Sequence, residues 1–178
     1  RDSSICNHDT RIQHALTSVF MGHSQEICGL AWSPDGTNLA SGGNENKLCI
    51  WDATMMAARE QTVAKYEINH HCAAVKALQW CPFQRNVLAS GGGTADKTIK
   101  IWNMNTGTML SSMNTGSQVC ALQWSEPNRE LVSSHGFSDF ELCLWKYSKQ
   151  HTLNKVRDFK GHTARVLHLA KSPDETRI

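Results

Sequence analysis

The stretch Leu48-Cys-Ile-Trp51-Asp52 recurs twice along the chain, and this recurrence determines the fold class. The two copies are Ile99-Lys-Ile-Trp102-Asn103 and Leu142-Cys-Leu-Trp145-Lys146. Each is a short, largely apolar run with a Trp before its last, polar residue, which is typical of a β-strand. The Trp residues are 51 and 43 residues apart (102 − 51 and 145 − 102), which indicates a repeated unit of supersecondary structure.

Two further strand-like runs precede each Trp-ended run. The first alternates apolar and polar residues, and it occurs within His23–Trp32, His71–Trp80, Thr115–Trp124 and His162–Lys171. The second occurs at Leu39–Gly43, Leu88–Gly92 and Leu131–Ser134. A more variable fourth strand leads into the next unit. Four strands in a repeat of about 40–45 residues predict one blade of a WD-repeat β-propeller.

The pattern divides the chain into three full four-stranded repeats and two partial ones. An insertion around Met55–Glu60 explains the longer first interval. The chain opens in a third strand, Ser4–Asp9, and Ala15–Phe20 is the fourth strand of that blade. The repeats lie at approximately residues 1–20 (partial), 21–69, 70–113, 114–160 and 161–178 (partial). Since a closed propeller needs typically 4–8 blades, we expect an all-β propeller fragment with two open sheet edges.

Composition limits the classes of protein and partner. The hydrophobic content of 40% and charged content of 19% fit a globular core. The net charge is +2 and the Lys and Arg residues are scattered, so we expect neither nucleic acid nor a membrane as a partner. Seven cysteines without a CxxC pair predict reduced thiols, and therefore a protein of the nucleus and cytoplasm. Because the chain starts at Arg1, the sequence leaves a leader peptide open.

A polar set recurs in the repeats and predicts a hydrogen-bonded network inside each blade. An acid in a turn bonds a His, the His bonds a strand hydroxyl, and the hydroxyl reaches a Trp N–H. Glu45 takes the acid position in the first repeat, and Thr115 replaces the His in the third. The set recurs once per blade, so we interpret it as structural and not as a catalytic triad. Its members are His23, Ser41, Trp51, His71, Ser90, Asp96, Trp102, Asp139 and Trp145.

No motif for metal or phosphate chemistry is found. His70-His71-Cys72 are three adjacent residues that cannot all face one ion, and no partner pair has zinc spacing. Gly91-Gly92-Gly93 is not followed by Lys-Ser/Thr or a helix pattern. We therefore predict no enzyme, no catalytic residue, no cofactor and no metal.

Polar residues concentrate in two kinds of loop that share one rim of a propeller. These loops enter each first strand or join the second strand to the third. Amides and hydroxyls with few charges suit hydrogen bonding to an extended peptide, although Asn and Thr also favour ordinary turns. The residues are Gln25, Glu26, Asn44, Asn46, Thr94, Ser117, Gln118 and Arg165.

Several strings closely resemble the Fizzy family, the cell-division-cycle coactivators of the anaphase-promoting complex. The most specific are Gly91-Gly-Gly-Thr-Ala-Asp96 and Thr115-Gly-Ser-Gln-Val-Cys120. Others are Gly22–Trp32, Leu39–Asn46, Ala74–Pro82, Glu130–Gly136 and Gly161–Leu167, so the resemblance runs along essentially the whole chain.

The resemblance implies a seven-bladed propeller in a non-enzymatic adaptor that recruits substrates to the ubiquitin ligase through short degrons. It implies as partners the subunits of the anaphase-promoting complex, substrates carrying KEN or destruction boxes, and checkpoint inhibitors. By residue-wise carry-over, Asn44, Asn46, Thr94 and Gln118 match the KEN receptor. The remaining receptor Arg is expected beyond Ile178, and the destruction-box groove outside this chain. The alternative is a WD-repeat scaffold without degron recognition.

Two branches of the family share these strings. Trp80-Cys-Pro-Phe-Gln84 favours the mitotic-entry branch, whereas Thr115–Cys120 and Gly93–Asp96 favour the late-mitotic branch. The sequence therefore assigns the family and leaves the branch open.

Overall fold

The computed structural model describes residues 2–54 and 63–178, and its regular elements in this part are β-strands. The predicted insertion at Met55–Glu60 lies outside the described residues. In the described part, no helix is long and apolar enough to span a bilayer. The strands are β1 (Ser4–His8), β2 (Leu16–Met21), β3 (Ile27–Trp32), β4 (Asn38–Gly43), β5 (Leu48–Asp52), β6 (Tyr66–Ile68), β7 (Val75–Trp80), β8 (Val87–Gly92), β9 (Thr98–Asn103), β10 (Thr108–Asn114), β11 (Val119–Ser125), β12 (Glu130–His135), β13 (Leu142–Tyr147) and β14 (Leu153–Phe159).

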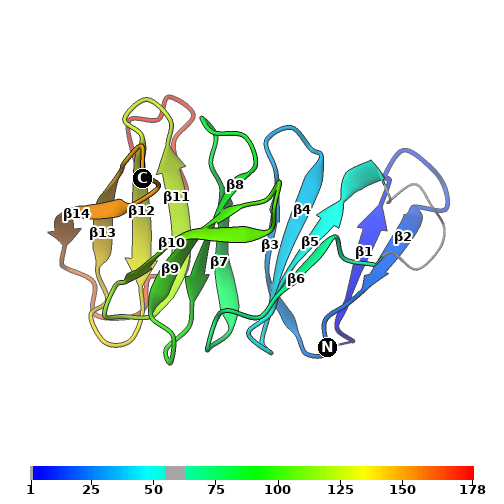
Figure 1. The fold of residues 1–178 in the computed structure, drawn as a ribbon, viewed down its shortest axis with the longest axis horizontal. Helices are drawn as coiled ribbons and strands as arrows, with labels where there is room; N and C mark the ends of the chain where they lie inside the picture. Colours follow the sequence, from blue (N-terminus) through cyan, green and yellow to red (C-terminus); the bar gives the residue numbers. More distant parts are fainter. Residues whose placement is uncertain (1, 55–62) are drawn as a thin grey trace.

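The strands form three four-stranded antiparallel sheets and one two-stranded sheet. Their orders are β3-β4-β5-β6, β7-β8-β9-β10, β11-β12-β13-β14 and β1-β2. Figure 1 shows the sheets side by side in chain order, as neighbouring blades are. The predicted fold class, an all-β propeller fragment, is confirmed.

Small residues allow the sheets to approach closely. A Cβ on Gly42 of β4 would lie 2.0 Å from the carbonyl oxygen of Val75 in the next sheet. A Cβ on Gly91 of β8 would lie 2.4 Å from a methyl group of Val119, one sheet further along. Because real Cβ atoms do not approach other atoms this closely, both positions require glycine. The Ser-Gly-Gly strings thus set the spacing between blades.

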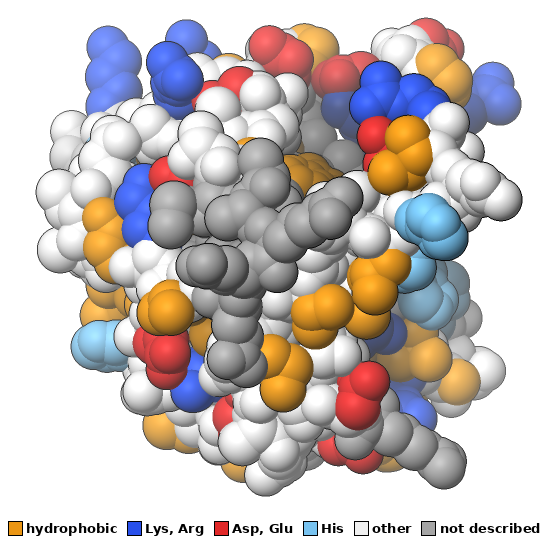
Figure 2. Space-filling model, turned by 90° about the vertical axis from the view of Figure 1, so that its right-hand side faces the viewer, with side chains coloured by type: hydrophobic (Ala, Val, Ile, Leu, Met, Phe, Trp, Pro, Cys, Tyr) orange, Lys and Arg blue, Asp and Glu red, His pale blue; other side chains and the backbone are white. Residues whose placement is uncertain are grey.

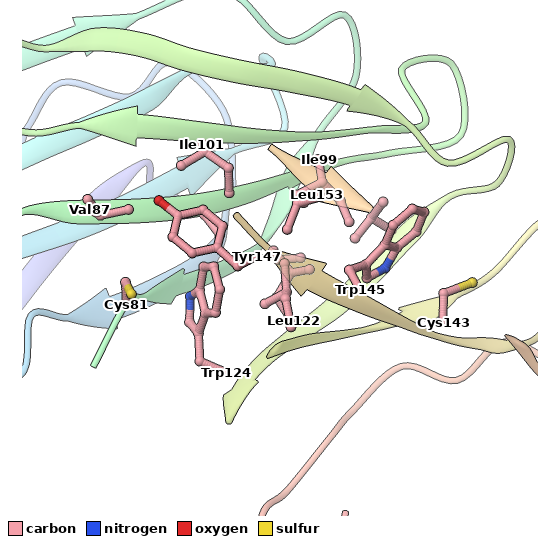
Figure 3. Packing of buried hydrophobic residues seen from close by; sticks show 14 residues of the cluster. Cys81, Val87, Ile99, Ile101, Leu122, Trp124, Cys143, Trp145, Tyr147 and Leu153 are labelled. Atoms are coloured by element: carbon pink, nitrogen blue, oxygen red, sulfur yellow. The ribbon is translucent and has the colours of Figure 1, made fainter. Parts of the chain in front are cut away.

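Aromatic and aliphatic side chains fill the space between the second and third full sheets. Figure 3 shows Trp124 and Tyr147 beside Ile101, all members of one buried cluster. The Trp124 and Tyr147 rings meet edge to face, with centroids 5.1 Å apart. This geometry is favourable for aromatic pairs and adds to the area that they bury.

In the second and third full sheets, a Trp near the end of the first strand ties the sheet to the preceding one. Trp80 Nε1 donates to Ala31 O at 2.9 Å, and Trp124 Nε1 donates to Gln79 O at 3.2 Å. Trp32 is 49% exposed, because the preceding sheet consists only of β1 and β2 and has no first strand in the described residues. Figure 2 views this end of the molecule and shows hydrophobic side chains at its surface.

The strand predicted within His162–Lys171 is not formed. The segment makes one main-chain hydrogen bond to β12, from Val166 N–H to His135 O at 3.2 Å. A β-ladder needs a paired strand, and no second strand of this repeat lies within the described residues. Alternation alone was therefore insufficient evidence for a strand here.

Candidate functional site

The first full repeat contains a hydrogen-bonded chain from its turn to its core. His23 Nδ1 lies 2.5 Å from Glu45 Oε1, and His23 Nε2 lies 2.7 Å from Ser41 Oγ. The Trp51 indole N–H donates to the same hydroxyl at 2.8 Å. Because a carboxylate can only accept a hydrogen bond, His23 Nδ1 carries a proton and donates it to Glu45. His23, Ser41 and Trp51 each have a partner in this chain, while the second carboxylate oxygen of Glu45, Oε2, is buried without a hydrogen-bond partner among the described residues.

The second repeat has the same chain with an Asp in place of the Glu. His71 Nδ1 lies 3.0 Å from Asp96 Oδ2, and His71 Nε2 lies 2.7 Å from Ser90 Oγ. The Trp102 indole N–H donates to Ser90 Oγ at 2.7 Å. In both repeats the Ser hydroxyl lies on the second strand, β4 or β8. It is hydrogen-bonded to the His that precedes the first strand and to the Trp of the third strand, and so it links all three.

Asp96 also organises the turn that carries Thr94. Its carboxylate accepts the backbone N–H groups of Cys72 at 2.6 Å and Thr98 at 3.0 Å. Burial by itself raises the pKa of this carboxyl, but the hydrogen bonds from His71, Thr98 and Cys72 outweigh burial and hold the pKa well below its ordinary value. Asp96 is therefore charged at neutral pH.

The third repeat departs from the sequence-based prediction. Asp139 was predicted to join the network, but it is exposed and its carboxylate has no hydrogen-bond or ion-pair partner among the described residues. The Thr115 hydroxyl instead lies 2.9 Å from both Lys97 O and Ser117 O, which share its single proton. The prediction for Asp139 is therefore wrong.

His135 takes the place of the missing turn His. Its Nε2 lies 2.7 Å from Ser133 Oγ, which accepts the Trp145 indole N–H at 2.7 Å. His135 is fully buried, and this burial lowers the pKa of its imidazole below the ordinary value. The third repeat thus retains the strand hydroxyl and the Trp of the network, but its imidazole belongs to β12 and not to the turn before the first strand.

The local sequence explains this exchange. His135 stands two residues after Ser133, at the position that Gly43 holds after Ser41. A Cβ on Gly43 would lie 2.6 Å from His23 Nδ1, so the turn His and a side chain at this position compete for one volume. The sequence difference is visible as Ser133-Ser-His-Gly136 in place of Ser-Gly-Gly. Only the structure shows that the His of this string occupies the volume of the turn His.

The turn between β4 and β5 presents two of the predicted receptor residues. Asn44 is exposed, and its main-chain N–H donates to Glu26 O at 2.9 Å. Its side-chain amide donates to the Glu26 carboxylate at 3.4 Å. Asn46 is half-buried and adopts a φ of 70°, a left-handed conformation that Asn tolerates well. These hydrogen bonds fix the turn and leave the Asn44 side chain exposed and the Asn46 side chain half-exposed.

The other two predicted residues lie on neighbouring loops of the same rim, at the lower edge of Figure 1. Thr94 is exposed in a turn closed by hydrogen bonds from the N–H groups of Asp96 and Lys97 to Gly93 O. Gln118 N–H donates to Phe137 O at 2.8 Å, and Gln118 Oε1 is buried without a hydrogen-bond partner among the described residues. The four predicted residues share one rim.

Two further loop residues differ in their availability. Ser117 is buried and its hydroxyl donates to Gly136 O at 3.3 Å, so it supports the loop and is not free for a ligand. Arg165 is exposed, and its guanidinium carbon lies 5.4 Å from the centroid of the Phe137 ring. Although the receptor Arg was expected beyond Ile178, Arg165 already places a cation beside the Gln118 loop.

One cluster of potential metal ligands was missed by sequence reasoning. Glu141, Cys143 and Asp158 bring ligand atoms within 4.8 Å of one another. Lys155 Nζ lies 2.6 Å from Asp158 and 3.7 Å from Glu141, so an ammonium group already neutralises the acids. Burial raises the pKa of the Cys143 thiol, which disfavours the thiolate that a metal needs. We interpret the cluster as an ion-paired edge of the sheet.

Comparison with known proteins agrees with the fold and the repeats. The model of the family described as "CDC20/Fizzy WD40 domain" matches residues 1–178. "Cell division cycle 20.1, cofactor of APC complex" of Arabidopsis thaliana is 50% identical over 97% of this chain and 37% of its own length. "Anaphase-promoting complex subunit cdc20" of Dictyostelium discoideum is 53% identical over 97% of this chain and 34% of its own length.

A further relative and a solved structure match equally widely. "Protein FIZZY-RELATED 3" of Arabidopsis thaliana is 48% identical over 98% of this chain and 34% of its own length. A chain in "Crystal Structure of Mitotic Checkpoint Complex" superposes with a TM-score of 0.92 at 46% identity, covering 98% of this chain and 52% of that one. This chain spans about a third of the length of the curated relatives it matches. It belongs to the CDC20/Fizzy WD40 family.

Proposed function

We propose that the protein containing this chain is a non-enzymatic coactivator of the anaphase-promoting complex, and that its loop rim binds KEN-type degrons of substrates. The names of relatives as cofactors of that complex support the first part. The observation that carries the second part is the rim of Asn44, Asn46, Thr94 and Gln118, which a hydrogen-bonded framework holds rigid.

The side chains of this rim complement a Lys-Glu-Asn peptide. Asn44 and Asn46 each offer both a donor and an acceptor, which suits a peptide main chain or the amide of the degron Asn. Gln118 Oε1 has no donor among the described residues, so turning it towards a ligand breaks no hydrogen bond of its own. The Arg165 guanidinium can donate two parallel hydrogen bonds to the degron carboxylate.

The checkpoint inhibitors expected as partners would use the same surface. The similar chain in "Crystal Structure of Mitotic Checkpoint Complex" supports checkpoint inhibitors as partners. An inhibitor that carries a KEN motif would compete with substrates for the Asn44 and Asn46 turn. A WD-repeat scaffold without degron recognition predicts no such competition.

Removing the two amides tests the receptor. Because Asn46 has a φ of 70°, Gly is the substitution that deletes its amide without strain. The full-length protein with Asn44→Ala and Asn46→Gly is expected to bind a KEN peptide about 1–3 kcal/mol more weakly, by fluorescence anisotropy, because buried hydrogen bonds to the ligand are lost.

The control for this experiment is Asn128→Ala, since Asn128 is exposed in the turn between β11 and β12, away from the candidate receptor. Its affinity for the KEN peptide is expected to equal that of the wild type. Unchanged affinity in the double variant contradicts the receptor. A wild-type protein that does not bind the KEN peptide favours the alternative of a WD-repeat scaffold without degron recognition.

A further inference from the structure

The turn between β12 and β13 holds an exposed aromatic side chain beside the candidate receptor. The Phe137 side chain is 51% exposed. The Phe140 ring packs against it, with centroids 5.7 Å apart and planes at 65°. The guanidinium carbon of Arg165 lies 5.4 Å from the Phe137 ring centroid. The Phe137 ring therefore contacts both a second ring and a cation.

The main chain on both sides of this contact is fixed. Phe137 O accepts the N–H of Gln118 at 2.8 Å, and Gly136 N–H donates to Gln118 O at 3.0 Å. On the other side, Val166 N–H donates to His135 O at 3.2 Å, and Lys76 Nζ donates to Leu167 O at 3.2 Å. Since both backbones are anchored, the ring has a fixed place from which to orient the Arg165 side chain.

The contact leaves the hydrogen-bonding capacity of the cation free. Within residues 2–54 and 63–178, the Arg165 guanidinium forms no ion pair and no hydrogen bond, and its identified contact is the Phe137 ring. A cation–π contact acts through the face of the ring and uses no N–H as a hydrogen-bond donor. The five N–H donors of the Arg165 guanidinium thus stay available for a planar, bidentate contact with a carboxylate.

We propose that Phe137 is a positioning residue that holds the Arg165 guanidinium ready for the acidic side chain of the bound peptide, and so sets the preference of the rim for Glu over Gln at that position. This inference rests on the proposed function. An exposed Arg side chain otherwise loses rotamer freedom when it binds, and the ring reduces that loss by restricting the side chain beforehand.

Two peptides separate this role from general support of the loop. One carries the KEN motif, and the other carries Gln in place of its Glu. In the full-length protein, Phe137→Leu is expected to weaken binding of the Glu peptide by roughly two- to five-fold and to leave the Gln peptide unchanged. Phe137→Tyr keeps an aromatic face and is expected to bind both peptides like the wild type. In an Arg165→Gln background, Phe137→Leu is expected to cause no further loss.

The outcomes test the positioning role of Phe137 separately from the proposed binding of KEN peptides by the rim. If Phe137→Leu weakens the binding of both peptides equally, or weakens binding further in the Arg165→Gln background, the positioning role is overturned. Unchanged affinity for both peptides overturns it as well. A wild-type protein that binds neither peptide better than a scrambled one contradicts the proposed function itself, and the role of Phe137 with it.

Discussion

Replacing Asp96 with Ala is expected to lower the free energy of unfolding of the propeller by about 3–5 kcal/mol, because it leaves buried partners of a charge unpaired. The carboxylate contacts His71 Nδ1 at 3.0 Å and accepts the N–H groups of Cys72 and Thr98. Ala supplies no acceptor for any of these donors, and water has little access since the Asp96 side chain is 2% exposed. Chemical denaturation of the full-length protein, followed by Trp fluorescence, measures the loss.

The matched control is Asp139→Ala, at the aligned position of the third repeat. Asp139 is exposed and outside the network, so we expect a change within about 0.5 kcal/mol. Equal losses for the two variants would contradict the structural difference between the repeats. They would instead support the sequence-based assignment of Asp139 to the network.

The contribution of Asp96 also depends on pH. Its pKa in the folded state lies below the ordinary value of 3.8, so its stabilising effect is complete above that value. The effect is lost as pH falls through the folded pKa, because the proton then binds both states. The difference in stability between the wild type and Asp96→Ala should therefore narrow below about pH 4.

The second large effect concerns the relocated imidazole. His135→Gly is expected to destabilise the third repeat by about 2–4 kcal/mol, since it empties a fully buried site and removes one of the two partners of Ser133 Oγ. Thr115→His alone is also expected to destabilise, by about 1–3 kcal/mol, because two imidazoles compete for one volume. Denaturation of each full-length variant measures both effects.

The double variant is expected to be more stable than either single variant. It restores the arrangement of the first two repeats, with an imidazole from the turn, Gly after the strand hydroxyl, and Asp139 at the aligned acid position. It should remain about 1 kcal/mol below the wild type, because the hydrogen bonds of the Thr115 hydroxyl are lost. Losses that simply add would contradict a shared volume, since residues that share a site couple by about 0.5–3 kcal/mol.

The sequence alone was sufficient where a local pattern determines the structure. Trp51, Trp102 and Trp145 lie near the ends of β5, β9 and β13 at repeat spacing, and turn residues separate the strands. It failed where a side chain responds to volume across the sheet. His135 looked unremarkable in a string of small residues, and only the place of Gly43 beside His23 shows which space His135 fills.

Pairing between segments was the second limit. His162–Lys171 alternates like a strand, yet a ladder depends on a neighbour that alternation cannot supply. For the same reason, the sequence pattern placed Arg165 among the polar loop residues without indicating what it contacts. Its contact with Phe137 joins two loops that are 28 residues apart (165 − 137).

Ubiquitination by the reconstituted anaphase-promoting complex tests the degron receptor most directly. The full-length protein and its Asn44→Ala plus Asn46→Gly variant would each be assayed with one substrate that carries only a KEN box and one that carries only a destruction box. If the rim is the KEN receptor, the variant loses ubiquitination of the first substrate and retains that of the second, which also shows that it folds and engages the ligase. Undiminished ubiquitination of the KEN-only substrate by the variant would contradict the assignment.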